Sequence, residues 1–354
     1  MDVSKRVNKE RGTRNVNKKL MLTGLAALML GLTACGAKET AAPATGNTGT
    51  THAGSGSQTP AASAPAAANQ AAPKKLTYLG KEYTITVPTD KIVITGSVES
   101  MEDALVLGVK PIGALTVGGK FPAIFSKITE GSTGIGEKTQ PSLETILKLK
   151  PDVILASTKF PAETLEKLGK VGTTVPVSHI STDWEANLNL LAELTGKQEL
   201  AKKALQSYKD EVKAVKEKLG PVFKDKKVVI IRVRSGSINL YPQDVFFNPS
   251  IYAELGAAVP EEVKQAKAQQ TVSLEKFSEM NPDYVFVQFA EEENADNPKA
   301  LQDLQNNPIW KSINAVKNGN VFVNLVDPAA QGGTAYSKIA FLDAVKSSKL
   351  MQAK

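Results

Sequence analysis

A fourteen-residue segment of the chain occurs twice, and this internal repeat limits the possible folds more than any other feature. The sequence SLETILKLKPDVIL at residues 142–155 returns as SLEKFSEMNPDYVF at residues 273–286, without a gap and displaced by 131 residues. In both copies a serine can cap a short helix, a glutamate lies in its first turn, and Pro-Asp ends it before an apolar strand. The repeat predicts two similar halves, although such a helix-to-strand turn can also recur because α/β proteins contain many of them.

Strand-like and helix-like patterns alternate before the first copy of this repeat. Residues 76–87 alternate apolar and polar side chains about Gly80, which is typical of a hairpin. Residues 91–95 and 111–115 have the composition of buried strands, and residues 99–107 between them have a helical pattern. This alternation favours an α/β fold with a parallel sheet.

Residues 196–220 separate the two halves and predict one long helix. Between two glycines lies KQELAKKALQSYKDEVKAVKEKL, in which apolar side chains recur every three or four residues and neither Pro nor Gly occurs. At 1.5 Å per residue this helix would be about 35 Å long, and Pro221 lies just past its end. We therefore expect two Rossmann-like α/β lobes with central parallel sheets, residues 76–195 and 221–354, joined by one long α-helix that forms a stiff hinge.

Residues 1–34 predict a lipoprotein signal peptide. A basic segment precedes LMLTGLAALMLGL at residues 20–32, an uncharged run that is too short to span about 30 Å of hydrocarbon comfortably. The next residues complete the sequence LTACG, which resembles the lipobox of bacterial lipoproteins, whose cysteine becomes the acylated amino terminus. Cys35 is the only cysteine of the chain, and acylation there would anchor the protein stably to a membrane. The alternative is a buried N-terminal helix with an incidental cysteine.

Residues 35–75 predict a disordered tether that starts at the lipidated Cys35. The segment after the cysteine consists mainly of Ala, Thr, Gly, Ser, Pro and Gln, with almost no large apolar side chain. It cannot bury enough surface to offset its ordering entropy.

The formal net charge of +7 belongs mostly to the predicted leader. Residues 1–34 carry seven of the 43 cationic and two of the 36 anionic side chains, so the remainder has a net charge of about +2. This balance argues against nucleic-acid binding. One cysteine and two histidines also exclude cysteine-rich zinc sites, disulfide frameworks and multi-histidine metal sites.

In this order, the features resemble the iron-siderophore substrate-binding lipoproteins of bacterial ABC importers, a helical-backbone class that also includes vitamin B12 and haem binders. The most similar subgroup is the Gram-positive one that takes hydroxamate or related siderophores. The matching stretches span about residues 90–345 and are residues 97–105, 141–158, 180–184, 244–249, 307–311 and 327–338.

The resemblance implies a solute-binding component on the extracytoplasmic face of the cell membrane. It would capture a ferric siderophore between its lobes and deliver it to an ABC permease dimer with a cytoplasmic ATPase. The siderophore itself holds the iron, so we expect a monomer with no cofactor, no metal ligands and no catalytic residues.

The family also implies a docking role for the glutamate of each Ser-Leu-Glu motif. In such proteins this glutamate lies on the outer top of its lobe and pairs with arginines of the permease dimer, which assigns the role to Glu144 and Glu275. The alternative is a first-turn glutamate that the helix dipole favours by about 0.3–1 kcal/mol.

The cargo site is expected between the lobes, on loops that leave strand ends. Siderophore oxygens suit cationic and phenolic side chains, and Arg234 ranks first because relatives carry a cargo-binding arginine on this strand end. A salt bridge to a nearby carboxylate is the alternative for the arginines. Tyr336 stands where relatives often have tryptophan, while Trp184 and Trp310 fit packing roles better. The candidate ligand-binding residues are Arg232, Arg234, Tyr241, Lys120, Lys159 and Tyr336.

Other functions remain as alternatives. Haem or cobalamin could bind in the same architecture, but haem usually needs axial His, Met or Tyr ligands, and His179 in the folded part fits a structural role. An enzyme is disfavoured because no nucleophile elbow or Walker loop occurs. A surface lipoprotein without a transport role is also possible, although the paired glutamates and the basic strand end argue against it.

Overall fold

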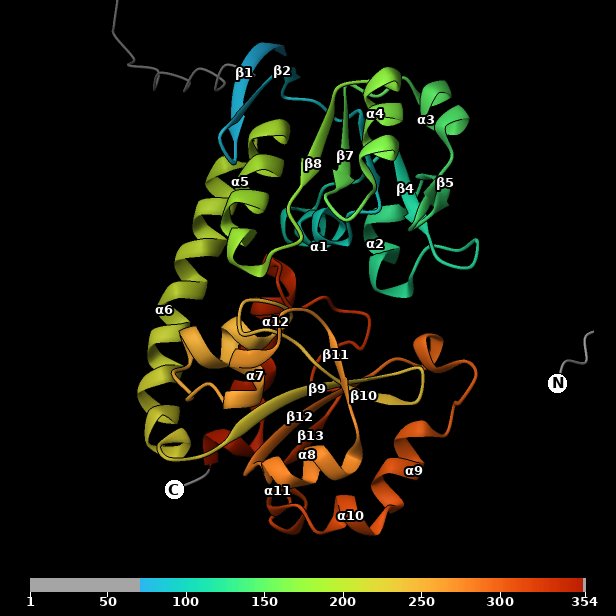
Figure 1. Ribbon diagram of the computed structural model, residues 1–354. Helices are drawn as coiled ribbons and strands as arrows, with labels where there is room; N and C mark the ends of the chain where they lie inside the picture. Colours follow the sequence, from blue (N-terminus) through green and yellow to red (C-terminus); the bar gives the residue numbers. More distant parts are fainter. Residues whose placement is uncertain (1–70, 353–354) are drawn as a thin grey trace, which may run out of the picture. The chain divides into compact units, whose positions relative to one another are not determined.

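The computed structural model describes residues 71–352, and Figure 1 shows them as two α/β lobes connected by a long helix. The chain enters through a hairpin in which β1 (Ala72–Tyr78) pairs antiparallel with β2 (Lys81–Val87). Gly80 supplies the positive φ, +78°, that the turn needs. The hairpin begins inside the predicted tether of residues 35–75, because backbone pairing with β2 orders residues 72–75 although their side chains are exposed.

The N-terminal lobe contains a six-stranded sheet in the order β6-β5-β4-β3-β7-β8. Its neighbours pair parallel, except for the antiparallel pair β5 and β6. The strands are β3 (Ile92–Thr95), β4 (Gly113–Thr116), β5 (Thr133–Glu137), β6 (Gln140–Pro141), β7 (Val153–Ser157) and β8 (Thr174–Val177). The helices of this lobe are α1 (Val98–Leu107), α2 (Ser126–Thr129), α3 (Leu143–Leu149), α4 (Ala162–Val171) and α5 (Trp184–Thr195).

The C-terminal lobe contains a five-stranded sheet in the order β11-β10-β9-β12-β13. The central strands β9, β12 and β13 are parallel, whereas β10 runs antiparallel to β9 and β11. The strands are β9 (Val228–Arg234), β10 (Ser237–Leu240), β11 (Gln270–Val272), β12 (Tyr284–Phe289) and β13 (Val321–Val323). The helices are α7 (Glu261–Gln265), α8 (Leu274–Met280), α9 (Ala300–Asn306), α10 (Pro308–Lys311), α11 (Asn314–Lys317) and α12 (Ala335–Ser347).

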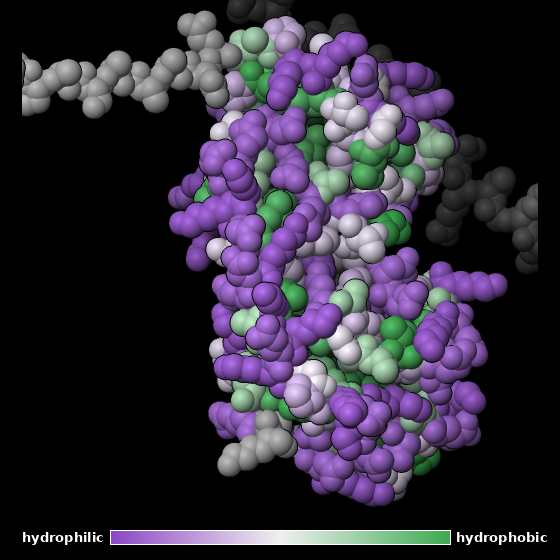
Figure 2. All heavy atoms as spheres, turned by 90° about the vertical axis from the view of Figure 1, so that its left-hand side faces the viewer, coloured by the Kyte–Doolittle hydropathy of each residue, from purple (hydrophilic) through white to green (hydrophobic). Residues whose placement is uncertain are grey.

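Helix α6 (Gln198–Phe223) joins the lobes and has 26 residues. The predicted fold of two α/β lobes and one long helix is therefore confirmed. The helix does not stop before Pro221 but continues to Phe223, whose ring is 2% exposed and lies edge-on to Tyr284 at 5.7 Å. Burial of this aromatic ring stabilises the last helical turn and offsets the helix-breaking effect of Pro221. The outer face along α6 is mostly hydrophilic in Figure 2, as expected of an amphipathic helix.

The sequence repeat corresponds to the same local structure in both lobes. Helices α3 and α8 have seven residues each, and the side chains of Ser142 and Ser273 cap them by accepting a backbone N–H three residues on. After each helix, the N–H of Asp152 or Asp283 donates to the carbonyl of the residue just before the neighbouring central strand, at 2.9 and 2.8 Å. Strands β7 and β12 then pair parallel with β3 and β9.

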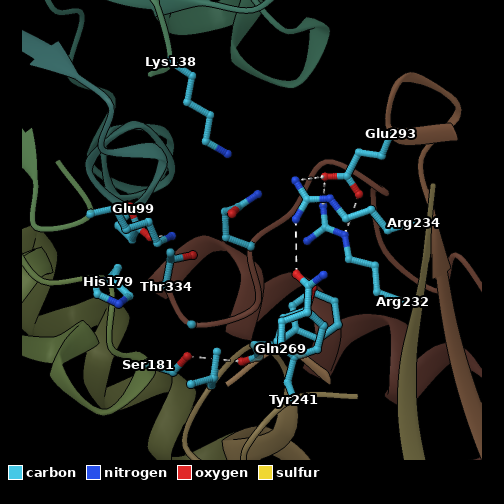
Figure 3. A pocket seen from close by; sticks show the side chains of 15 residues that line it. Glu99, Lys138, His179, Ser181, Arg232, Arg234, Tyr241, Gln269, Glu293 and Thr334 are labelled. Carbon is cyan, nitrogen blue, oxygen red and sulfur yellow. Dashed lines mark hydrogen bonds and ion pairs between the residues drawn. The ribbon is translucent and has the colours of Figure 1, made fainter. Parts of the chain in front are cut away.

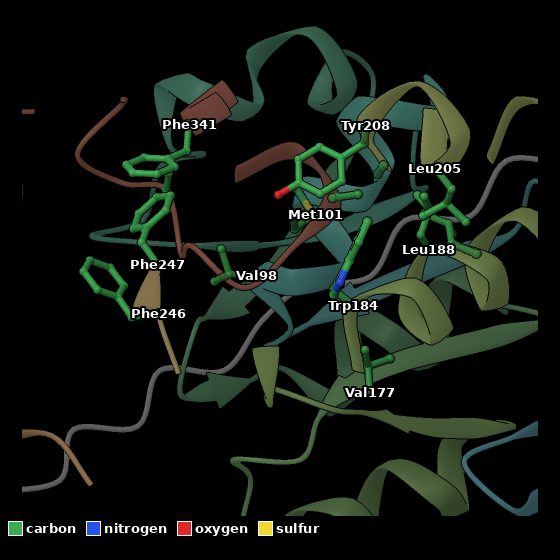
Figure 4. Close-up of a cluster of buried hydrophobic side chains, with 14 of the residues drawn as sticks. Val98, Met101, Val177, Trp184, Leu188, Leu205, Tyr208, Phe246, Phe247 and Phe341 are labelled. Atoms are coloured by element: carbon green, nitrogen blue, oxygen red, sulfur yellow. The ribbon is translucent and has the colours of Figure 1, made fainter. Parts of the chain in front are cut away.

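One hydrophobic cluster connects the lobes (Figure 4). It includes Met101 and Trp184 of the N-terminal lobe together with Phe247 and Phe341 of the C-terminal part. Helix α12, although last in sequence, packs against α1. Trp184 lies edge-on to Tyr208 at 5.3 Å.

Trp310 packs inside the C-terminal lobe, where it is 2% exposed and stacks on Phe277 at 5.9 Å. The packing roles predicted for both tryptophans are confirmed. None of the helices within residues 71–352 is long and apolar enough to cross a membrane.

Candidate functional site

A cavity of about 310 Å³ is lined by residues of both lobes (Figure 3). Four of its residues carry positive charge and come in two pairs, Lys138 and Lys159 from the N-terminal lobe and Arg232 and Arg234 from the C-terminal lobe. The position of three of them follows from the fold: Lys138 and Lys159 follow the ends of β5 and β7, and Arg234 is the last residue of β9. These strand ends are where α/β sheets usually place ligands.

The arginine pair is organised by one carboxylate. Arg232 is 6% exposed, and its guanidinium donates from Nε and Nη2 to the two carboxylate oxygens of Glu293, at 2.7 and 2.9 Å. Nη2 of Arg234 lies 3.5 Å from the same carboxylate, and its Nη1 donates to Oε1 of Gln269 at 3.2 Å. The side chain of Arg234 is 44% exposed. Both arginines therefore form the salt bridge to a carboxylate that was the alternative to cargo binding. Arg234 also presents its guanidinium to the cavity.

Tyr241 completes the C-terminal side of the cavity. Its hydroxyl donates to Oε1 of Gln269 at 3.0 Å, so Gln269 links the tyrosine to Arg234. Burial raises the pKa of Tyr241, which keeps the phenol protonated and able to donate. The ring also lies 4.8 Å from that of Phe246, above which the Arg232 guanidinium is placed at 5.4 Å.

The lysine pair lies on the opposite side, beside Glu99 of α1. Lys159 Nζ donates to Oε1 of Glu99 at 2.9 Å, while Oε2 of Glu99 is buried and has no hydrogen-bond partner within the described chain. Burial, and after it the positive charge of Lys159, lowers the pKa of Lys138. The same two causes lower the pKa of His179, whose Nδ1 lies 2.8 Å from the Thr158 hydroxyl.

The electrostatic consequence is a cavity suited to an anion. Four cations face two carboxylates, Glu99 and Glu293, among the lining residues. The pKa of Lys138 is lowered first by burial and then by the nearby positive charge of Lys159. A multiply charged anion bound between the pairs would relieve this repulsion and raise that pKa again.

Four of the six predicted ligand residues meet at this cavity: Lys159, Arg232, Arg234 and Tyr241. Lys120 is exposed and lies outside the lining, in a loop whose Gly118 and Gly119 N–H groups both donate to the carboxylate of Glu137. Tyr336 is half-buried in the first turn of α12, also outside the lining.

Several lining residues were not predicted from the sequence. Lys138 follows β5 just as Lys159 follows β7, so a strand-end signal existed, but the strand sequence TGIGE is too polar and glycine-rich to be recognised. Glu293 lies in the acidic run EEEN, which has no periodic pattern. His179 was expected in a structural role and lines the cavity. Further lining residues that were not predicted include Glu99, Gln269, Phe246 and Thr334.

The two motif glutamates lie on the surface, outside the cavity lining. Glu144 and Glu275 are both exposed and occupy the first turns of α3 and α8, at equivalent positions of the two lobes. The side chain of Glu144 is 79% exposed and pairs with Lys148 one turn later, at 2.6 Å. Cys35, with the predicted signal peptide and most of the predicted tether, lies outside the described residues.

Known proteins share the sequence features of this chain. A family profile for periplasmic binding proteins matches residues 120–324. The iron-uptake system-binding protein of Bacillus subtilis (strain 168) is 54% identical over 302 residues, which cover 85% of this chain and 95% of that protein. The probable siderophore-binding lipoprotein YfiY of the same organism is 29% identical over 253 residues, 68% of this chain and 77% of that protein.

A solved structure has the same fold as this chain. The triscatecholate siderophore binding protein FeuA from Bacillus subtilis, complexed with ferri-bacillibactin, superposes with a TM-score of 0.75 at 57% identity. The match covers 79% of this chain and 99% of that protein. By profile, sequence and fold, the chain belongs to the periplasmic binding protein family.

Proposed function

We propose that this protein is the extracytoplasmic solute-binding component of an ABC importer. It captures a ferric siderophore between its two lobes and delivers the complex to a membrane permease for iron uptake. The observation that carries the proposal is the cavity with a pair of cations from each lobe, Lys138 and Lys159 on one side and Arg232 and Arg234 on the other.

The proposed cargo class is a ferric triscatecholate. Three catecholate dianions around one ferric ion give a trianionic complex, which the four cations can bind through charge-assisted hydrogen bonds even though Glu99 and Glu293 already offset two of their charges. A neutral ferric hydroxamate needs only one cationic fork plus aromatic surface, so it would leave the net positive charge of the cavity uncompensated. The bound ligand of the 57% identical structure, ferri-bacillibactin, supports the same class.

Each lining residue has a definable role in this proposal. Arg234, Lys138 and Lys159 present donors to the catecholate oxygens. Arg232, which Glu293 already engages through two hydrogen bonds, supports Arg234 and adds positive charge. The Tyr241 hydroxyl already donates to Gln269, so this residue contributes aromatic surface at the edge of the cavity.

Delivery requires a contact with the permease and its cytoplasmic ATPase. We assign this contact to Glu144 and Glu275, because the two lobes present the same exposed carboxylate on the same short helix. Charges at the rim of an interface act mainly on association rate and specificity. For the membrane side, we assign acylation to Cys35, and a relative described as a lipoprotein supports this assignment.

Titration of tryptophan fluorescence with a panel of ferric complexes tests the proposal. The panel contains a triscatecholate, a hydroxamate and ferric citrate, and the triscatecholate should bind tightest. Lys138→Ala should weaken that binding at least tenfold, whereas Lys120→Ala, which changes an exposed lysine outside the cavity lining, should not. Tighter binding of the neutral hydroxamate, or equal losses in both variants, would contradict the proposal.

A further inference from the structure

Glu102 in α1 is a buried carboxylate that cargo binding alone does not explain. The residue is 0% exposed and lies outside the cavity lining, so it does not touch the cargo. Burying an ionisable group costs free energy unless it is hydrogen-bonded. The partners that Glu102 has therefore indicate what the carboxylate is for.

Three donors from the C-terminal part of the chain converge on Glu102. The backbone N–H of Gln331 donates to Oε1 at 2.8 Å. The hydroxyls of Thr334 and Ser337 both donate to Oε2. Thr334 is also the N-cap of the 13-residue helix α12, so a negative charge here is favoured by the helix dipole as well.

A second carboxylate of α1 contacts the same helix start. Oδ1 of Asp103 accepts a longer hydrogen bond, 3.4 Å, from the N–H of Ala335. Helices α1 and α12 pack against each other along this contact. An N-terminal lobe helix thus binds the start of the last helix of the chain through two adjacent carboxylates.

The segment that Glu102 binds, residues 328–334, also forms a wall of the cavity. Gln331, Gly333 and Thr334 all line it. The beginning of the segment is held by the C-terminal lobe, because Nε2 of Gln288 in β12 donates to the carbonyls of Pro328 and Ala330, at 2.9 Å each. The wall is therefore tied to one lobe at its start and to the other lobe at its end.

The lobes approach closely at this wall. A Cβ atom on Gly333 would lie 2.0 Å from Oγ of Ser181 in the N-terminal lobe, a distance that only glycine allows. The Ser181 hydroxyl in turn points at the carbonyl of Phe246, 3.4 Å away, on the C-terminal side. Small movements of residues 331–334 would therefore change the contact between the lobes.

We propose that Glu102 is a positioning residue for cargo binding, because it fixes residues 331–334 against the N-terminal lobe and so sets the spacing between the lysine pair and the arginine pair. The inference rests on the proposed function, in which both pairs engage one anion. Geometry that is fixed before binding removes an ordering cost from the binding step. Loss of the carboxylate should consequently weaken cargo binding although the residue touches no cargo.

The test compares Glu102→Leu and Glu102→Gln in the full chain. Hydrogen exchange of backbone amides, measured without cargo, should become faster across residues 331–337 in Glu102→Leu. Affinity for a ferric triscatecholate, read from tryptophan fluorescence, should fall roughly tenfold in the same variant. Glu102→Gln should bind within about threefold of the parent, because its amide oxygen still accepts from Gln331 and its amide nitrogen can donate to a hydroxyl oxygen.

Asp283→Leu is the matched control, because Asp283 accepts a backbone hydrogen bond from Lys227, 2.9 Å, within one lobe, and leucine removes that acceptor. It should lose stability without losing affinity. Parental affinity in Glu102→Leu, or an equal loss of affinity in Asp283→Leu, would overturn the proposal. If Glu102→Leu fails to fold, Ser337→Ala is used instead, because it removes one donor from the same contact. Parental cargo affinity and parental hydrogen exchange in Ser337→Ala would then overturn the proposal. A parent that binds no ferric siderophore refutes the proposed function instead, while the exchange data still report the Glu102 contact.

Discussion

Arg232 and Glu293 form a two-pronged ion pair, with Nε and Nη2 of the arginine 2.7 and 2.9 Å from the two carboxylate oxygens. The pair connects β9 to the short helical turn Glu291–Asn294. Arg234 shares the same carboxylate at 3.5 Å. Glu293 thus acts as an internal counter-ion that holds two arginines in place before any anion arrives.

Removal of this counter-ion should destabilise the cargo-free protein. Glu293→Ala leaves the nearly buried Arg232 without its partner, and breaking a buried pair in this way costs about 3–5 kcal/mol. Since Glu293 remains partly exposed, at 21% of its side chain, we expect a loss of unfolding free energy near the lower end of this range. Urea denaturation measures it.

A bound anion should partly replace the missing carboxylate. The increase in melting temperature on adding a ferric triscatecholate should therefore be larger for Glu293→Ala than for the parent. Glu279→Ala removes a surface glutamate that pairs with Lys276 at 3.0 Å and serves as the control, with no change expected. An unchanged cargo-free stability of Glu293→Ala would contradict the counter-ion role.

Arg234→Ala should weaken cargo binding with little effect on folding. Its guanidinium is the more exposed of the two, 44% against 8% for Arg232, so its surface ion pair contributes little to stability. A charge-assisted hydrogen bond to cargo is worth about 1.5–3 kcal/mol, which predicts roughly ten- to a hundredfold weaker binding. Arg234→Lys should rescue only partly, because a point charge cannot reproduce a planar fork. Intact affinity together with a lower melting temperature would assign Arg234 to structure instead.

Glu144→Ala and Glu275→Ala should each lower iron uptake while cargo affinity stays the same. Both carboxylates lie on the surface of their lobes, outside the cavity lining. Glu163 offers a matched control, because it is an exposed glutamate that pairs with a lysine one turn later, Lys167 at 2.7 Å, just as Glu144 pairs with Lys148. Uptake assays on cells that carry each variant decide the matter. Full uptake in the double variant would remove the docking assignment.

Cys35→Ala should release the folded protein from the membrane without changing its cargo affinity. Acylation is the only chemistry that we assign to this cysteine, and two acyl signals are needed for stable anchoring. Cell fractionation followed by sizing separates a processed, released protein from a precursor that the leader still holds. A variant that is normally processed and still membrane-bound would refute the lipobox assignment.

Local signals in the sequence predict the repeated unit of the fold well. Ser142 and Ser273 cap their helices, and Pro-Asp ends them, because capping and proline effects depend on few neighbouring residues. The end of α6 differs from the prediction because burial of Phe223 against the C-terminal lobe outweighs the local stop signal of Pro221. The free energy of burying Phe223 depends on tertiary packing, so the local sequence does not reveal it.

The site was predicted where cations end an apolar strand, as at Arg232 and Arg234, or follow one, as at Lys159. Side-chain direction and long-range pairing are absent from such patterns. Glu293, which lies 61 residues from its partner Arg232, was therefore not predicted as a site residue. For the same reason Lys120 was predicted at the site, although it lies outside the cavity lining, in a loop whose Gly118 and Gly119 N–H groups donate to Glu137.

Glu102 should make folding stability depend on pH near neutrality. Burial, opposed by hydrogen bonds from Ser337, Thr334 and Gln331, raises the pKa of Glu102 to about 7 from 4.5. Glu99 and Asp103 on the same helix add negative charge, and the phenol of Tyr336 on α12 lies nearby.

The sign follows from proton binding. Between pH 4.5 and 7 the folded protein holds a proton on Glu102 that the unfolded chain has lost, so the contribution of this group is complete below that window and disappears as the pH rises through 7. The unfolding free energy should fall by up to about 1.4 kcal/mol per pH unit there, or about 3 kcal/mol in total. Asp103, whose pKa burial also raises, acts in the same direction, whereas His179, whose pKa burial lowers, acts against it.

Comparison with Glu102→Gln isolates the contribution of Glu102 from those of its neighbours, because the amide does not titrate. Urea denaturation of both proteins from pH 5 to pH 8 gives the difference in unfolding free energy at each pH. We expect the parent to lose stability relative to Glu102→Gln as the pH rises, mostly between pH 5 and 7, since only the parent must place a charge in the contact between α1 and α12. A difference that stays constant over this range would show that Glu102 keeps an ordinary carboxylate pKa despite its burial, and the hydrogen bonds from Gln331, Thr334 and Ser337 would then outweigh the cost of desolvation.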